Sequence, residues 1–343
     1  MKLLVTGGAG FIGSHFIHRW LTRHPADQIV TLDALTYAGS RERLADVDPA
    51  RHRFLRGSVG EPEVVREAVS GCEVVVHFAA ETHVDRSITD AVPFIRTNVE
   101  GTYVLLREAQ AAGVKRFLHV STDEVYGPIL EGAVTESASL APRSPYAASK
   151  AAGDLLVQAA RETFGLPAII VRPTNVFGPW QFPEKFIPLC ITRAAEAVPI
   201  PLYGDGRQRR AWLFVADCCE AIERLVEQGE VGASYNLAGG VERENRETAT
   251  LILSQIGRPE SLLEFVADRP GHDRRYAMDD AKLRALGWQP RTPFEQGISD
   301  TITWYLEHRE WWKPLAQKLR DDPAHWLNRP AGPGVGPIPR PVR

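Results

Sequence analysis

Two pairs of ionisable side chains in this 343-residue chain have the types and spacing that acid–base chemistry requires. Asp123 and Glu124 are adjacent carboxylates in STDEVYG, directly after the apolar run RFLHV. Tyr146 and Lys150 stand four residues apart in SPYAASK, so one helical turn brings them to the same face. Because an ammonium favours a neighbouring phenolate, we predict that Lys150 lowers the pKa of Tyr146 and makes it a base near neutral pH. The simpler interpretations are a polar loop for the acids and a solvated helix face for the second pair.

A glycine-rich turn near the N-terminus has the pattern of a phosphate-binding site. In TGGAGFIGS, Gly7, Gly10 and Gly13 recur at three-residue intervals between a predicted strand and a predicted helix. Glycines there allow backbone N–H groups to approach a pyrophosphate, and the helix adds its positive dipole end. Asp33 ends the next predicted strand, 20 residues beyond Gly13, where an acid accepts hydrogen bonds from an adenosine ribose. An acid there repels a 2′-phosphate, which favours NAD over NADP; alternatively, Asp33 only caps the following turn.

The elements that position these residues alternate between short apolar strands and helical segments. The alternation predicts a Rossmann-type α/β fold, a doubly wound parallel sheet with helices on both faces. Helices are expected over 98–113, with Val99, Tyr103 and Leu106 on one face, and over 145–165. The predicted strands are KLLVTG, QIVTLD, RFLRGS, EVVVHFAA, RFLHVSTDEV and PAIIVRP.

The composition changes near residue 180, where Pro, Gly and aromatic residues begin to interrupt short segments. We therefore expect an NAD-binding domain over 1–180, to which the chain returns near 210–228, and a smaller α/β substrate lobe over 181–325. Residues 326–343 are rich in Pro and Gly, which predicts a disordered tail.

Charge and cysteine content exclude several classes of partner. The net charge of −3 gives no reason to expect nucleic acid or an anionic membrane, and no apolar run is long enough to span a bilayer. The N-terminal apolar residues break into glycines after the first strand and offer no cleavage site for a signal peptide. Four cysteines, Cys72, Cys190, Cys218 and Cys219, lack metal-ligand spacing. Buried thiols in a reducing cytoplasm and no bound metal are the expectation.

The motifs TGGAGFIG, STDEVYG and YAASK together resemble the extended short-chain dehydrogenase/reductases, and within them the dTDP-glucose 4,6-dehydratases, which retain NAD tightly. The similarity runs from Met1 to about Leu315 and includes AAETHVDRS, FPEKFIP, YGDG, NLAGG and DRPGHDRRY. The resemblance implies that Thr122 holds the sugar 4-hydroxyl while Tyr146, with Lys150, removes its proton and C4 passes hydride to NAD⁺. It further implies that Glu124 removes the C5 proton and that Asp123 protonates the departing 6-hydroxyl.

The resemblance also implies two sets of binding residues. Arg210 and Arg269 are the expected diphosphate clamps, because a guanidinium binds phosphate oxygens bidentately. The implied cofactor-binding residues are Gly7, Gly10, Phe11, Ile12, Gly13, Asp33, Ser58, Ala79, Ala80, Thr82, Asn98, Tyr146 and Lys150. The implied nucleotide-sugar contacts are Ser87, Asn175, Glu184, Lys185, Arg210, Asn245, Arg269 and His272.

Three positions depart from the usual family pattern. Ser58 stands where the family usually has an Asp that contacts adenine, Val176 replaces a second Asn, and Ala211 replaces a frequent Asp. All three are near the expected ligands, so they leave the nucleobase and the exact sugar open.

Two alternative functions share parts of this pattern. A sugar-nucleotide 4-epimerase or uronate decarboxylase has the Thr–Tyr–Lys triad but generally lacks the acid pair. A non-catalytic NAD sensor tends to lose Tyr or Lys, and both are present here. In the family the helices near 98–113 and 145–165 pair two subunits as a four-helix bundle, so a homodimer is expected.

Overall fold

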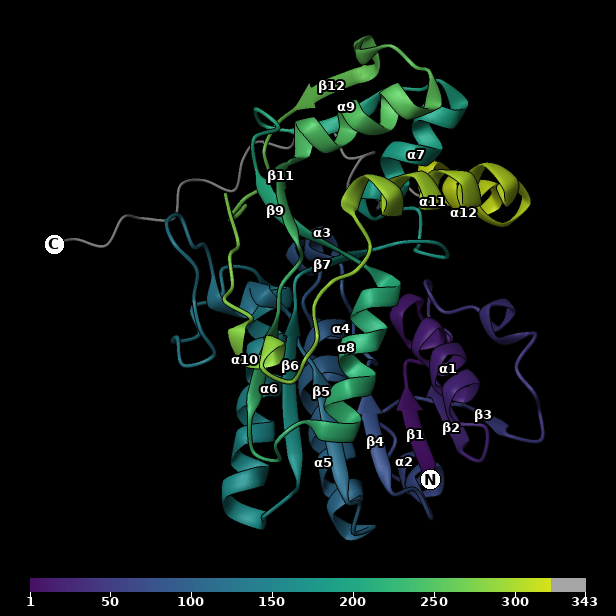
Figure 1. The fold of residues 1–343 in the computed structure, drawn as a ribbon, viewed down its shortest axis with the longest axis vertical. Coiled ribbons are helices and arrows are strands. Elements are labelled where there is room, and N and C mark those ends of the chain that lie inside the picture. The colour runs from purple at the N-terminus through teal and green to yellow at the C-terminus, as the bar shows by residue number, and fades with distance from the viewer. Residues whose placement is uncertain (322–343) are drawn as a thin grey trace, which may run out of the picture.

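A seven-stranded parallel sheet forms the larger part of the protein, of which the computed structural model describes residues 1–321 (Figure 1). The tail expected at 326–343 lies outside the described residues. All neighbouring strands in this sheet run parallel, so their carboxyl ends share one edge. In spatial order the strands are β10 (Ser234–Leu237), β6 (Ala168–Pro173), β5 (Arg116–Val120), β4 (Val74–His77), β1 (Lys2–Thr6), β2 (Gln28–Asp33) and β3 (His52–Arg56).

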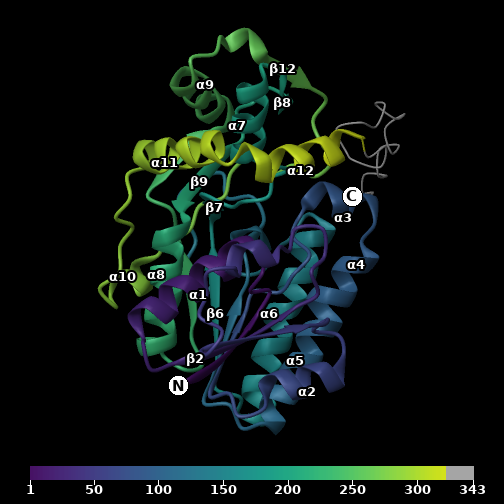
Figure 2. The ribbon, with the colours of Figure 1, turned by 90° about the vertical axis from the view of Figure 1, so that its right-hand side faces the viewer.

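Helices cover both faces of this sheet, as Figure 2 shows from the side. On one face α1 (Phe11–Arg23) packs against α8 (Val215–Gln228), and on the other α2 (Pro62–Val69), α5 (Thr102–Ala111) and α6 (Pro145–Phe164) lie together. Successive residues of a strand point to opposite faces, so Leu3 and Val5 enter the first core while Leu4 enters the second. The doubly wound arrangement predicted from the sequence is confirmed.

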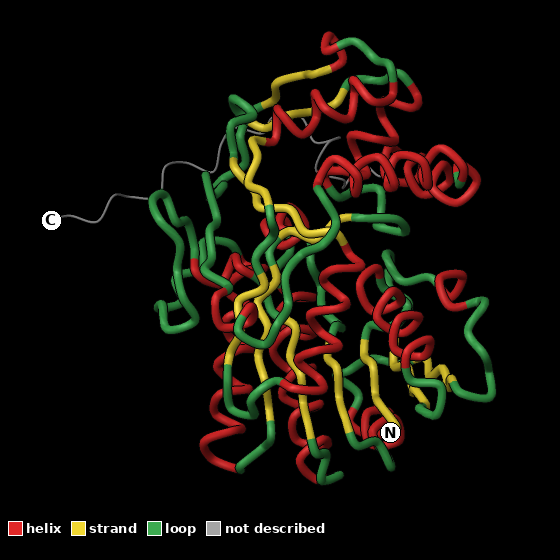
Figure 3. The backbone as a smooth tube through the Cα atoms, in the orientation of Figure 1, coloured by secondary structure: helices red, strands yellow, loops and turns green. Residues whose placement is uncertain are grey.

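A second set of elements has a core of its own above the carboxyl edge of the large sheet (Figure 3). Its sheets are β11–β9–β7 and β12–β8. Aromatic and aliphatic side chains from the helices fill this core, including the buried Trp312 and Phe294. The elements are β7 (Asn175–Phe177), α7 (Phe186–Glu196), β8 (Ile200–Tyr203), β9 (Arg209–Phe214), β11 (Val241–Glu244), α9 (Asn245–Ile256), η4 (Glu260–Leu262), β12 (Leu263–Val266), α11 (Phe294–Glu307) and α12 (Arg309–Asp321).

The chain returns to the large sheet over a longer stretch than the expected 210–228. Residues 209–214 form β9 of the second set, and the return begins with α8 and continues through β10. Leu283, in α10 (Ala281–Arg284), and Trp288 are also buried in the first core. The four residues of β10, SYNL, escape prediction, because they lack the apolar run that identifies β4, which is equally short.

The helix expected over 98–113 begins earlier and contains a π-helical segment. After α3 (Val84–Thr89), the chain forms α4 (Val92–Phe94), η2 (Ile95–Gly101), which is π-helical, and then α5. The buried side includes Asn98, Leu105 and Leu106, whereas Tyr103 is 53% exposed. The prediction that Tyr103 shares the apolar face of Leu106 is therefore wrong, because the buried face of α5 runs through Leu105, Leu106 and Ala109 and leaves Tyr103 outside it.

Candidate active site

The predicted catalytic and cofactor residues all lie at or just beyond the carboxyl ends of parallel strands or on the helices that follow them. Gly7 follows β1, Asp33 ends β2 and Ser58 follows β3. Ala79, Ala80 and Thr82 follow β4, and Thr122 follows β5. The order β2–β1–β4 puts the reversal of strand order beside β1, where open α/β sheets bind their ligands.

The glycine-rich turn is shaped by contacts that exclude a side chain. Gly7 has φ +69°, and a Cβ there would lie 2.6 Å from the backbone nitrogen of Ala79. A Cβ on Gly13 would lie 2.4 Å from the carbonyl oxygen of Gly7, so α1 packs directly against the turn. Gly10 is the N-cap of α1, and Phe11 and Ile12 form its first turn. The free N–H groups of that turn point along the helix dipole towards the carboxyl edge, as pyrophosphate binding requires.

Asp33 is held by the backbone of the same turn. Its Oδ2 accepts a hydrogen bond from the N–H of Ala9 at 2.9 Å, and its Oδ1 accepts one from Leu35 at 2.8 Å. Burial raises the pKa of this carboxyl, and these two N–H groups and Arg43 oppose the rise. Asp33 thus both caps the following turn, as the simpler interpretation had it, and stands at the position expected of a ribose-binding acid.

Asn98 joins the loop after β4 to the helix that carries the Tyr–Lys pair. Its Oδ1 accepts from the N–H of Glu81 at 2.9 Å, and its Nδ2 donates to the carbonyl of Glu81 at 3.0 Å and to Ser149 Oγ at 2.8 Å. All of these contacts are with protein groups. Through these bonds Asn98 holds the loop after β4 against α6.

The acid pair occupies a single 3₁₀ turn, η3 (Asp123–Tyr126), directly after β5. Thr122 is the N-cap: its Oγ1 accepts from the N–H of Glu124 at 3.3 Å and donates to Asp123 Oδ1 at 3.2 Å. Asp123 Oδ2 also accepts from Thr174 Oγ1 at 3.1 Å. The predicted strand RFLHVSTDEV therefore ends at Val120, because the Thr122 side chain satisfies the backbone of a turn.

The two carboxyls of the acid pair have different electrostatic surroundings. Burial and the adjacent Glu124 raise the pKa of Asp123 to about 7. Burial also raises the pKa of Glu124, but three cations oppose that rise: Arg269, Arg210 and Lys185. Environments that separate the proton affinities of two carboxyls assign one as acid and the other as base. This arrangement favours Asp123 as the acid and Glu124 as the base.

Tyr146 and Lys150 lie in the first two turns of α6, which starts where the sequence predicts it. Ser144 caps the helix by accepting from the N–H of Ala147 at 3.1 Å, and Pro145 fits the first turn, where a missing N–H costs nothing. The Tyr146 hydroxyl is hydrogen-bonded to Thr122. The three residues of the predicted triad therefore converge from β5 and α6.

The prediction that Lys150 lowers the pKa of Tyr146 is wrong for this structure. Burial, Glu124 and Asp123 raise the pKa of Tyr146 well above its ordinary value, and only the hydrogen bond with Thr122 opposes them. Lys150 Nζ instead donates to the carbonyl of Val120 at 2.7 Å, and burial lowers the pKa of Lys150 to about 8. Desolvation of the buried phenol therefore decides the pKa of Tyr146, and the Lys150 ammonium, which is already hydrogen-bonded to a carbonyl, does not offset it.

The residues predicted to bind nucleotide sugar divide into two groups. Lys185, Arg210 and Arg269 contribute positive charge near Glu124, and Lys185 Nζ donates to the carbonyl of Thr82 at 2.9 Å. The side-chain oxygens of Asn175 and Asn245 are buried, and neither has a hydrogen-bond partner among the described residues. The unpartnered amide oxygens suit the hydroxyl groups of a polar ligand, and the cations suit its anionic groups.

The remaining predicted contacts have protein partners. Ser87 Oγ accepts from the N–H of Tyr146 at 3.1 Å and donates to Val84, so it fixes the start of α6. Glu184 Oε2 pairs with Arg86 at 3.0 Å. His272 Nδ1 lies 2.6 Å from Asp268 Oδ1, and burial lowers its pKa to about 4.

Sequence reasoning missed Tyr276, whose hydroxyl lies 3.5 Å from Glu124 Oε2 and 2.9 Å from Asp273 Oδ2. It also missed Thr174, the partner of Asp123, which lies two residues before Val176. The motif DRPGHDRRY contains Tyr276, but nothing local in that segment indicates a contact with Glu124, 152 residues away.

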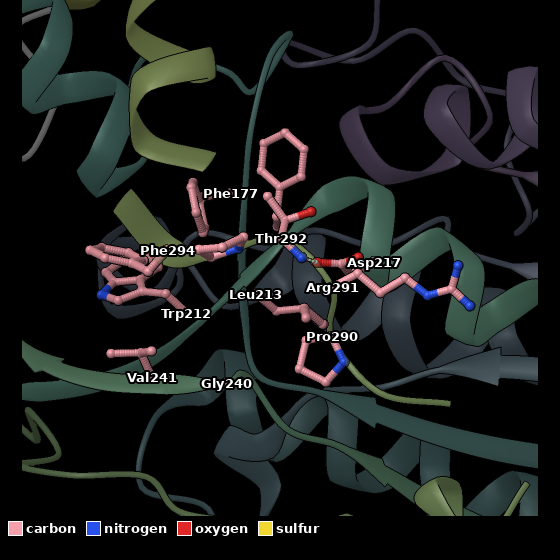
Figure 4. A pocket seen from close by; sticks show the side chains of 12 residues that line it. Phe177, Trp212, Leu213, Asp217, Gly240, Val241, Pro290, Arg291, Thr292 and Phe294 are labelled. Carbon is pink, nitrogen blue, oxygen red and sulfur yellow. Dashed lines mark hydrogen bonds between the residues drawn. The ribbon is translucent and has the colours of Figure 1, made fainter. Parts of the chain in front are cut away.

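A separate pocket of about 220 Å³ lies between β9, β11 and the segment before α11 (Figure 4). Aromatic side chains line it, including Phe177, Trp212 and Phe294, and none of the predicted site residues does. Its carboxylate, Asp217, already accepts from the N–H of Thr292 at 2.9 Å. The pocket is therefore distinct from the site at the carboxyl edge.

Comparisons with known proteins agree with the geometry of this site. The family model described as GDP-mannose 4,6 dehydratase matches residues 4–301. The low-salt glycan biosynthesis protein Agl12 of Haloferax volcanii is 52% identical over 89% of this chain and 99% of its own length. A dTDP-glucose 4,6-dehydratase of Streptomyces niveus is 47% identical over 92% of this chain and 96% of its own length.

A solved structure extends the agreement to the fold. DesIV, the dTDP-glucose 4,6-dehydratase of Streptomyces venezuelae, was solved with NAD and TYD bound. It superposes with a TM-score of 0.90 at 48% identity and covers 92% of this chain and all of its own. The chain therefore belongs to the nucleotide-sugar 4,6-dehydratase family of the extended short-chain dehydrogenase/reductases.

Proposed function

We propose that this protein is an NAD-dependent dTDP-glucose 4,6-dehydratase that forms dTDP-4-keto-6-deoxyglucose and water. The observation that carries the proposal is the acid pair beside a Thr–Tyr–Lys triad, with Asp123 able to hold a proton near neutral pH and Glu124 among three cations. Epimerases and decarboxylases need the triad but no second acid. Curated dTDP-glucose 4,6-dehydratases at 44–47% identity support the same reaction.

NAD fits the residues that the structure places at the carboxyl edge. The turn at Gly7 and Gly13 leaves no room for side chains, and the N–H groups at the start of α1 face the position of a pyrophosphate. Asp33 suits a ribose and repels a 2′-phosphate. Ser58, at the end of β3, supplies a hydroxyl on the adenine side, and Ala79 and Ala80 leave space for the nicotinamide. Held by these residues, NAD would supply the hydride acceptor for C4 of the sugar and the hydride donor for C6.

The residues of the chain then supply the proton transfers. Tyr146, hydrogen-bonded to Thr122, takes the proton of the 4-hydroxyl. A protonated Asp123 removes one of the two negative charges that disfavour the Tyr146 phenolate, so the acid form of Asp123 supports this first step. Glu124 removes the C5 proton, which the 4-ketone has acidified, and Asp123 donates its proton to the departing 6-hydroxyl. When C6 receives hydride, Glu124 returns its proton to C5, and the proton that Tyr146 took offsets the one that Asp123 lost.

The second set of elements holds the nucleotide diphosphate in this proposal, so that 1–180 and the lobe from 181 onward act as cofactor and substrate parts. Arg210 and Arg269 approach the same carboxylate, Glu124, from β9 and from the loop after β12. Phosphate oxygens placed between them would form charge-assisted hydrogen bonds. Asn175 and Asn245 add amide groups, and Glu184 and His272 contribute through Arg86 and Asp268.

We also propose that the protein works as a homodimer in the cytoplasm. Large apolar side chains are exposed on neighbouring helices of one face: Ile88 on α3, Val92 on α4, Ile95 on η2, Tyr103 on α5 and Leu155 on α6. A patch of this kind on packed helices is typical of a subunit interface. Within the described residues, no helix is long and apolar enough to cross a membrane.

The test of the function is the product. Purified protein is incubated separately with dTDP-glucose, with UDP-glucose and with the corresponding uronates. The masses of the products are then measured by mass spectrometry. We expect loss of one water from dTDP-glucose. An unchanged mass with an inverted C4 would indicate an epimerase, and loss of carbon dioxide from the corresponding uronate would indicate a decarboxylase; either result contradicts the proposal.

A further inference from the structure

Arg43 is a buried arginine that donates hydrogen bonds to backbone carbonyls alone. It lies in η1 (Arg41–Leu44), in the loop that follows Asp33, and is 3% exposed. Nη1 donates to Ala9 at 2.8 Å and to Ala38 at 2.7 Å, while Nε and Nη2 donate to Trp180 at 3.2 and 2.9 Å. Burying this side chain is costly unless its donors are satisfied, so the three carbonyls are held where the guanidinium requires them.

Two of these carbonyls belong to the adenosine half of the proposed cofactor site. The N–H of Ala9 donates to Asp33, and the carbonyl of Ala9 accepts from Arg43. The same carbonyl also accepts from the N–H of Ser40 at 3.0 Å. Asp33 and Arg43 thus hold the two backbone polar groups of a single residue, Ala9, in the glycine-rich turn. The carbonyl of Ala38 ties the loop after β2 to the same guanidinium.

The third carbonyl belongs to the segment that leads into the second set of elements. Trp180 has φ +64°, an uncommon conformation for a large side chain, and this directs its carbonyl to Arg43. Its ring packs against Trp304 of α11 and Trp311 of α12, with centroids 4.8 and 5.1 Å apart. The Arg43 guanidinium itself lies 5.4 Å from the Trp311 ring. The two C-terminal helices therefore hold the partner of Arg43 in place.

We propose that Arg43 is a positioning residue that holds the adenosine side of the cofactor site against the substrate lobe. This contact would slow the release of NAD between turnovers. This inference rests on the proposed function only in naming NAD as the ligand. For the loop after β2 to move away from the glycine-rich turn, Arg43 must give up its bonds to Ala9 and Trp180 while it is shielded from water. A cofactor that is regenerated in each turnover gains from such retention, because it never needs to leave.

The test measures NAD exchange in the holoenzyme without substrate. Protein loaded with radiolabelled NAD is mixed with excess unlabelled NAD, and the label that remains bound is followed over time. Arg43→Lys keeps the charge but has one nitrogen, so it cannot reach three carbonyls. Arg43→Met keeps the apolar stem and removes all donors. Both variants lose charge-assisted hydrogen bonds to backbone carbonyls, so we expect NAD release to be at least about tenfold faster in each.

Arg51 provides a matched control at the amino ends of the strands, away from the cofactor site. It too donates to three carbonyls, those of Asp27, Leu21 and His24, at 3.1, 3.0 and 2.6 Å. Arg51→Lys should lower the melting temperature without changing NAD release. The proposal is overturned if the Arg43 variants release NAD at the wild-type rate, or if Arg51→Lys accelerates release as much as Arg43→Lys does. A protein that binds NAD but fails to dehydrate dTDP-glucose would refute the proposed function and leave this inference intact.

Discussion

Asp123 and Glu124 are neighbours in the sequence, yet different parts of the fold surround them. Asp123 points to two hydroxyls, those of Thr122 and Thr174, and burial raises its pKa to about 7. Glu124 faces the cations of the second lobe and the hydroxyl of Tyr276. One residue is therefore suited to carry a proton and the other to accept one, although their side chains start from adjacent backbone positions.

The base role of Glu124 predicts a selective defect. Glu124→Gln keeps the size and hydrogen bonding of the side chain but cannot remove the C5 proton, so dehydration should fall by at least about a hundredfold. Nucleotide-sugar binding, measured by calorimetry with dTDP-glucose, should remain close to wild type. Dehydration at the wild-type rate would show that another group is the base. Glu131→Gln, an exposed acid in the loop after η3, is the control and should have no effect.

The acid role of Asp123 predicts a shift in the pH profile. Thr174 donates a hydrogen bond to the Asp123 carboxylate and thereby lowers its pKa. Thr174→Val removes that bond, so the pKa of Asp123 should rise and its acid form should persist to higher pH. Above the pKa of Asp123, which is about 7 in the wild type, the dehydration rate should fall as this acid loses its proton. In Thr174→Val this fall should occur at higher pH. Thr174→Ser retains the hydroxyl and should keep the wild-type profile; an unchanged profile in Thr174→Val would exclude Asp123 as the titrating acid.

Sequence patterns locate the residues of the site better than they describe the contacts of those residues. The spacing of the residues indicates the Tyr–Lys pair and the acid pair, the resemblance to the family adds Thr122, and the structure brings them together. The effect of Lys150 on Tyr146 was predicted from their separation on a helix and is wrong, because burial and nearby carboxylates decide the pKa of the phenol. Spacing along a helix reports which face a residue shares, whereas desolvation depends on elements from the whole chain.

At the scale of elements, the predicted strands β1 to β6 are confirmed; five of them are buried and mostly apolar, as parallel strands are, whereas β3 is a partly exposed edge strand. The short strands of the second lobe and β10 escape prediction, since segments such as SYNL in β10 and VERE in β11 lack the apolar run that identifies β4, which is equally short. The π-helical segment η2 also escaped prediction. It arises where Asn98 makes three side-chain bonds to neighbouring elements, an effect of tertiary contacts that a helical pattern does not contain.

The contacts of Asn98 predict that this segment is important for stability. Asn98→Ala leaves the N–H and carbonyl of Glu81 and the hydroxyl of Ser149 without that partner. Buried groups that lose a hydrogen bond cost about 1–3 kcal/mol each, so the free energy of unfolding should fall by roughly 2–4 kcal/mol. Urea denaturation measures it. Glu100→Ala, an exposed position in the same π-helical segment, should change it by less than about 0.5 kcal/mol. Equal effects of the two substitutions would show that the contacts of Asn98 are not the cause.

At the scale of the whole molecule, the chain crosses between its two cores several times, and the site lies where it crosses. Asp123 is bonded to Thr174, on the crossing from β6 to β7, and Thr174 also donates to the carbonyl of Ala211 in β9. Ala211 thus contributes only its backbone carbonyl to this contact. Any residue could supply that carbonyl, including the Asp that the family frequently has at this position. The change of composition near residue 180 indicated a second lobe, but the return through α8, β10 and α10 depends on packing that composition does not reveal.

The exposed apolar face predicts how two molecules associate. Tyr103 on α5 and Leu155 on α6 are 53% and 56% exposed, and these helices pack against each other. A second copy that presents the same face would bury both side chains in an isologous contact of four helices. The wild type should therefore sediment as a dimer at low micromolar concentration, and Leu155→Glu should sediment as a monomer, because a carboxylate in an apolar interface has no partner. Phe265→Glu, at a 50% exposed position of β12 in the second lobe, is the matched control and should remain dimeric. A monomeric wild type, or a Leu155→Glu variant that stays dimeric, would place the interface elsewhere or exclude it.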